Sequence, residues 1–239
     1  DTWVVNSGGA SLDNAGNSST SFTMPASDVE VTATYKDIEY SVTVNSGSGD
    51  GDYTAGQTVN ITAGTAPTGQ QFKRWVVNSG GASLANANNA STSFTMPANA
   101  VEVTAEYEDI EYVVTVNSGS GDGSYTYGDN VSIVASSAPA GKQFKRWVVN
   151  SGGASLANAN NASTSFTMPA GNVEVTAEYE DITYSVTVND GSGDGNYALG
   201  QTVNVSADAP ATGKEFIQWT VHSGGVSLVD EDQMNTSFT

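Results

Sequence analysis

The chain has 239 residues, of which 26 are acidic and 7 basic, and its formal net charge is −19. A surface so poor in positive charge repels phosphate groups, so nucleic acid is excluded as a partner and direct insertion of this segment into a membrane is not expected. Cysteine is absent, which excludes disulfides, thiolate metal sites and cysteine nucleophiles.

The chain repeats itself every 72 residues, as the spacing of Trp3, Trp75, Trp147 and Trp219 shows. A period of this length suits an array of small domains, each with its own core. The sequence predicts an incomplete unit at 1–39, complete units at 40–111 and 112–183, and a unit at 184–239 that stops early. We therefore expect a window on a longer array, in which neighbouring repeats are the first partners.

The first part of the complete unit 40–111 predicts two strands. Apolar residues alternate with polar ones from Tyr40 to Asn45, as in a half-buried strand. A glycine-rich stretch, 45–52, follows, and the alternation resumes over 57–63. Two strands joined in this way are expected to pair as a hairpin.

The rest of the unit predicts three more strands, Phe72 to Asn78, Ser91 to Met96 and Val101 to Tyr107. The intervening residues 82–89 are rich in Ala and Asn and offer at most one helical turn. Only four residues separate Tyr107 from Tyr112. A linker this short, without glycine, predicts semi-rigid junctions between the repeats.

Aromatic residues recur in every unit and are expected to fill the core, because aromatic side chains dominate core burial. Phe72 and Trp75 lie three positions apart, so a regular strand would point them to opposite faces; we expect a β-bulge that realigns them. An aromatic platform for sugars, with Tyr53, is the alternative. The predicted core residues are Trp3, Trp75, Trp147, Trp219, Phe72, Phe144 and Phe216.

The residues resemble the divergent internalin-B-type B-repeat of bacterial cell-surface proteins. The resemblance rests on Gly49-Asp-Gly-Asp-Tyr53, on Pro67 to Trp75, and on the segments Ser-Phe-Thr-Met-Pro and Val-x-Val-x-Ala-x-Tyr. It covers essentially the whole chain. It implies an all-β array of small five-stranded modules outside the cell, each a β-sandwich or a β-grasp-like sheet.

The glycine-rich loop carries an aspartate at the same place in each repeat. Two interpretations remain open: a tight turn, in which aspartate beside glycine is common, or an oxygen-rich calcium site. No other cofactor is expected. The candidate calcium ligands are Asp50, Asp52, Asp122 and Asp194.

Seven N-x-S/T sequons recur with the repeat and are candidates for glycosylation if the source uses this modification. Three of them fall on outward positions of the second predicted strand. The seven asparagines are Asn17, Asn60, Asn89, Asn130, Asn161, Asn204 and Asn235.

The sequence favours a non-catalytic stalk, spacer or fibre of a secreted or surface-anchored microbial protein over an enzyme, since no catalytic constellation repeats. The only histidine, His222, stands where other repeats have asparagine. One alternative is an adhesive array that gains avidity for a surface glycan or host protein. Another is a filament in which identical chains associate by strand addition.

Overall fold

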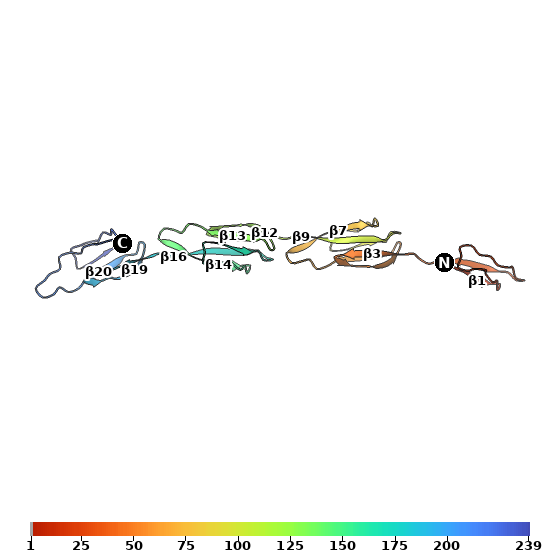
Figure 1. Ribbon diagram of the computed structural model, residues 1–239, viewed down its shortest axis with the longest axis horizontal. Helices are drawn as coiled ribbons and strands as arrows, with labels where there is room; N and C mark the ends of the chain where they lie inside the picture. Colours follow the sequence, from red (N-terminus) through yellow and green to blue (C-terminus); the bar gives the residue numbers. More distant parts are fainter. Residues whose placement is uncertain (1) are drawn as a thin grey trace. The chain divides into compact units, whose positions relative to one another are not determined.

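The computed structural model describes residues 2–239, which form strands, turns and loops (Figure 1). No helix occurs among these residues, so the single turn considered at 82–89 is not helical. The chain divides into two compact units, Asp1–Glu108 and Asp109–Thr239. The all-β prediction is confirmed.

The first complete repeat has seven strands in two sheets. All five predicted strands are present, and the glycine-rich connection adds two short strands that the sequence did not reveal. The strands are β3 (Glu39–Asn45), β4 (Gly47–Ser48), β5 (Gly51–Thr54), β6 (Thr58–Ala63), β7 (Gln70–Ser79), β8 (Ser91–Thr95) and β9 (Val101–Asp109).

The second complete repeat has the same seven strands. They are β10 (Glu111–Asn117), β11 (Gly119–Ser120), β12 (Gly123–Thr126), β13 (Asn130–Ala135), β14 (Lys142–Ser151), β15 (Ser163–Thr167) and β16 (Val173–Asp181).

The outer units contain parts of the same pattern. Residues 2–39 form the antiparallel pair β1 (Thr2–Ser7) and β2 (Glu30–Thr34). The last unit forms β17 (Thr183–Val186), β18 (Gly191–Ser192), β19 (Gly195–Ala198), β20 (Val203–Ala207) and β21 (Asn235–Phe238).

The pairing of the strands differs from the expected hairpin. One sheet has the order β5-β3-β9-β7 and the other β4-β6-β8. Strand β3 pairs in parallel with β9, whereas β6 pairs with β4 and β8. The hairpin prediction is wrong because the glycine-rich connection crosses from one sheet to the other, placing the first and second predicted strands in different layers.

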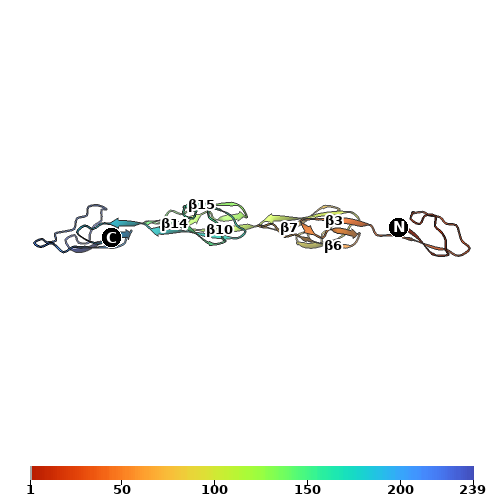
Figure 2. The same ribbon diagram turned by 60° about the horizontal axis from the view of Figure 1, so that its bottom comes forward.

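The strands of each complete repeat lie in two layers (Figure 2). Buried side chains from both sheets form one core cluster in each repeat. Val44, Trp75 and Val103 come from the first sheet, and Ile61 and Phe94 from the second. Each complete repeat therefore has its own apolar core, and the β-sandwich describes it better than a single grasp-like sheet.

The aromatic core residues are aligned by a bulge. Register shifts between Phe144 and Arg146 where β14 pairs with β16, so one residue of β14 is left over. The rings of Phe144 and Trp147 consequently lie on the same face, with centroids 6.1 Å apart. The predicted bulge is confirmed in this repeat.

The loop after β7 closes one side of the sandwich. The backbone N–H of Trp75 donates to the carbonyl of Ala87 at 2.8 Å, and that of Ala85 donates to Ser93 at 2.8 Å. The loop thus bridges β7 of one sheet and β8 of the other. Bridging of this kind satisfies backbone groups that an edge strand would otherwise expose.

Candidate functional site

The aspartate of the glycine-rich loop bonds to the backbone. Oδ1 of Asp50 accepts a hydrogen bond from the N–H of Val44 at 2.8 Å. Asp122 accepts from Val116 at 2.8 Å, and Asp194 from Val188 at 3.0 Å. In these three repeats the carboxylate therefore holds the loop against the end of the first strand. A side chain that accepts a hydrogen bond from a nearby backbone N–H stabilises a turn in this way.

The remaining candidate calcium ligand, Asp52, lies exposed on β5 opposite Ser41. Within residues 2–239, no group of three or more His, Cys, Asp or Glu side chains is arranged to hold a metal ion. The geometry supports the turn interpretation of the loop, and calcium binding stays a prediction that a titration has to test.

A tyrosine of β9, the strand that pairs with β3, clamps the same loop. The hydroxyl group of Tyr107 lies 3.1 Å from the carbonyl oxygen of Ser46 and 2.8 Å from that of Gly64. Ser46 has a φ of 58°, a left-handed conformation that is costly for a residue with a side chain. The clamp therefore fixes a strained turn at the point where the chain leaves the first sheet.

All seven sequon asparagines are exposed. Asn60, Asn130 and Asn204 lie on the outward face of the second sheet, on β6, β13 and β20. Asn235 lies at the start of β21. The other three lie in turns and are Asn17, Asn89 and Asn161.

The outward residues of β6 and β8 form a surface without ionisable groups, which we call the hydroxyl-amide face. Directly opposite pairs across the two strands consist of Thr, Ser and Asn side chains. In the first complete repeat they are Thr58 and Thr95, Asn60 and Ser93, and Thr62 and Ser91. The absence of charge stands out in a chain with a net charge of −19.

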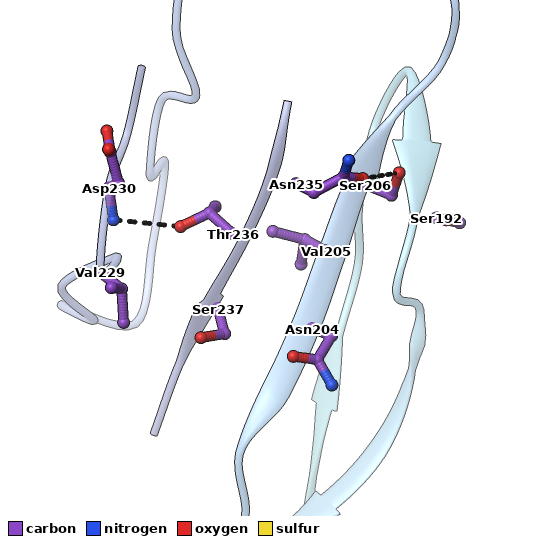
Figure 3. A pocket seen from close by; sticks show the side chains of 9 residues that line it. All are labelled: Ser192, Asn204, Val205, Ser206, Val229, Asp230, Asn235, Thr236 and Ser237. Carbon is purple, nitrogen blue, oxygen red and sulfur yellow. Dashed lines mark hydrogen bonds between the residues drawn. The ribbon is translucent and has the colours of Figure 1, made fainter. Parts of the chain in front are cut away.

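In the last unit a hollow of ≈ 480 Å³ opens at this face (Figure 3). Asn204 and Ser206 of β20 and Asn235 and Ser237 of β21 line it, and Asp230 of the neighbouring loop contributes a charge at its border. Hydroxyl and amide groups of this kind donate and accept hydrogen bonds with neutral polar ligands.

The outward face of the first sheet is charged, in contrast. Nδ2 of Asn45 donates to Glu102 at 2.8 Å, and Oγ1 of Thr104 donates to Asn78 at 2.8 Å. Arg74 forms an ion pair with Glu106 through Nε at 2.8 Å. The second complete repeat has the equivalent contacts, from Asn117 to Glu174, Thr176 to Asn150 and Arg146 to Glu178, at 2.8, 2.8 and 2.9 Å.

The aromatic platform considered for sugars is not formed in the complete repeats, because Trp75 and Trp147 are only 3% and 2% exposed. Phe72 and Phe144 are half-buried against them. Trp3, Trp219 and Phe216 are half-buried in the outer units, which contain fewer strands of the sandwich.

The described residues place no nucleophile beside a histidine, since His222 is exposed and its Nδ1 lies 3.1 Å from the carbonyl of Thr220. A search of residues 2–239 for a helix with the length and apolar character to cross a bilayer found none.

Comparison with known proteins agrees with the repeat. The family model for a divergent InlB B-repeat domain matches residues 1–39, 40–111, 112–183 and 184–239. A search of curated proteins found no match. With every segment of the chain matched, the protein belongs to the divergent InlB B-repeat family.

Proposed function

We propose that this chain is a non-catalytic spacer segment of a bacterial surface protein, in which tandem repeats supply reach. The family favours a bacterial surface location. One observation carries the proposal: the two complete repeats reproduce the same internal contacts, from buried core to surface ion pairs. The contacts that are repeated are those that stabilise each unit. A spacer built from tandem repeats requires that each unit fold stably.

The physical properties of the repeat suit this role. Each complete unit encloses its own core, so further units add length without altering those already present. The excess of acidic side chains keeps neighbouring molecules apart through like-charge repulsion. Such a segment stays extended from its point of attachment only if its junctions resist bending.

Small-angle X-ray scattering tests the proposal. A second copy of residues 112–183 is inserted after Thr183 of the full chain, which keeps the 72-residue register, and the maximum dimension is compared with that of the parent. An increase of about 30 Å per copy is expected from the size of a 72-residue domain. An unchanged maximum dimension would mean that the repeats fold back on one another, and the spacer function would be abandoned.

A second candidate function is adhesion to a neutral glycan through the hydroxyl-amide face. The hollow beside β20 and β21 favours it, because its lining supplies donors and acceptors with little charge. Binding of the full chain to an array of neutral glycans is compared with that of the variants Asn204→Asp and Ser237→Asp. Binding by the parent that both variants lose would support adhesion; equal signals from all three would dismiss it.

Strand addition between chains, the third function expected from the sequence, has less support in the complete repeats. The edge strands β4 and β5, one in each sheet, have only 2 and 4 residues. At β7, the other edge of the sheet that contains β5, the backbone of Trp75 bonds to the loop that follows. Short or covered edges are the means by which proteins avoid such pairing.

A further inference from the structure

We propose that Leu199 is the docking side chain by which the unit 184–239 fastens onto the preceding repeat, and that the turn at Gly141 is its receptor. The inference rests on the proposed spacer function, for which it names the element that stiffens a junction. Both residues lie within the compact unit Asp109–Thr239.

The contact itself is close. Gly141 has a φ of +75°, and a Cβ placed on it would lie 2.9 Å from both Cβ and Cδ2 of Leu199. Any residue other than glycine would therefore collide with the leucine. With this contact in place Leu199 is still 65% exposed, so the turn at Gly141 covers part of a large apolar side chain that stands at the tip of a turn.

The linker is tied to the same turn. The backbone N–H of Ile182, the one residue between β16 and β17, donates to the carbonyl of Gly141 at 2.8 Å. Beside it, Nζ of Lys142 forms an ion pair with Asp181 at 2.8 Å. The turn at Gly141 thus holds the chain as it leaves one repeat and receives a side chain of the next.

The chain contains its own comparison. Gly213 occupies the place of Gly141 in the last unit and has a similar φ of +84°, but no atom lies within 4 Å of a Cβ built on it. The turn is therefore the same in both units, and only Gly141 is covered. The crowding at Gly141 comes from Leu199 and is not a property of the turn.

Truncation of the docking side chain tests the proposal in the full chain. The natural sequence has no cysteine, so Asn130→Cys and Asn204→Cys, on exposed positions of β13 and β20, accept spin labels without background. Electron–electron double resonance then measures the distribution of distances between the two repeats. We expect Leu199→Ala to widen this distribution at least twofold, whereas Ile217→Ala, which removes another exposed apolar side chain, leaves the width unchanged.

A pair of glycine variants separates docking from backbone strain. Gly141→Ala and Gly213→Ala impose the same left-handed strain, but only the first also collides with Leu199. We expect Gly141→Ala to displace or widen the distance distribution, Gly213→Ala to leave it unchanged, and Leu199→Ala to reverse much of the effect of Gly141→Ala.

Two results would overturn the inference. One is an unchanged width in Leu199→Ala with both repeats still folded by circular dichroism, and the other is equal effects of the two glycine variants. Failure of the spacer function is a separate outcome: the scattering experiment would then show no gain in length, while the dependence of the distance distribution on Leu199 would be unaffected.

Discussion

Gly119 lies directly against the indole ring of Trp147: a Cβ built on this glycine would be 2.6 Å from Cη2 of the ring. The same approach occurs between Gly47 and Trp75, at 2.8 Å. The glycine is the first residue after the chain turns from one sheet toward the other. The backbone has to pass over the edge of the ring there, which leaves no room for a side chain.

The first prediction follows from this contact. Gly119→Ala should lower the opening free energy of β13 and β14 by about 1–3 kcal/mol, because overpacking a dense core forces the neighbours to shift. Hydrogen exchange of the full chain, resolved by strand, measures this. Gly171→Ala is the matched control, since no atom lies within 4 Å of its Cβ and the change should be close to zero. Equal protection in both variants would show that the ring moves freely.

The second prediction concerns the tyrosine clamp. The hydroxyl group of Tyr179 lies 2.6 Å from the carbonyl oxygen of Ser136 and 3.2 Å from that of Ser118. Tyr179→Phe removes these hydrogen bonds but keeps the ring, so the second repeat should lose about 0.5–1.5 kcal/mol. The free energy of unfolding of the second repeat is measured by urea unfolding that is monitored by strand-resolved hydrogen exchange. Tyr184→Phe, at a tyrosine that is 53% exposed, should cost nothing measurable, and a similar loss in both would refute the clamp.

The strands could be predicted from the sequence because alternation is a local signal. Val42 and Val44 point to the core and Ser41 and Thr43 to solvent, as period two requires. The pairing could not be predicted in this way. Whether β3 bonds to β6 or to β9 depends on where the glycine-rich connection crosses between layers, and that crossing is determined by packing against Trp75.

The candidate site was only partly accessible from the sequence. The sequence singles out Asp50, but composition cannot distinguish a carboxylate that binds metal from one that accepts a backbone N–H, because both occur in glycine-rich loops. The hydroxyl-amide face did have a signal: Thr58, Asn60 and Thr62 alternate with buried residues. Its continuation onto Ser93 required the register of β6 with β8, which is tertiary information.

The third prediction separates the two interpretations of the aspartate. Asp50→Ala leaves the N–H of the buried residue Val44 without its acceptor, which should destabilise β3 by about 1–3 kcal/mol. Asp52→Ala, two residues away and exposed, should have almost no effect. Amide exchange of β3 in the full chain measures both.

Calcium supplies the opposing outcome. If the loop is a turn held by Asp50, its protection is the same with a chelator and with millimolar calcium. Protection that rises with calcium in the parent, and is lost in both Asp50→Ala and Asp52→Ala, would establish a metal site instead.

The fourth prediction compares one residue type at the same repeat position in two environments. Met168 is fully buried, at 0% exposure, whereas Met24 occupies the equivalent position in the first unit and is 62% exposed. Met168→Ala should therefore cost about 2–5 kcal/mol in the second repeat, while Met24→Ala should change stability by less than about 0.5 kcal/mol. The backbone bonds of Met168 to Gly128 and Asp129 do not involve its side chain, so Met168→Ala keeps them and its cost reports the burial of the side chain. Thermal unfolding of the two variants, monitored by tryptophan fluorescence, gives the comparison. Equal shifts would mean that the repeat position, rather than the sandwich built around it, determines the energetic role of the methionine.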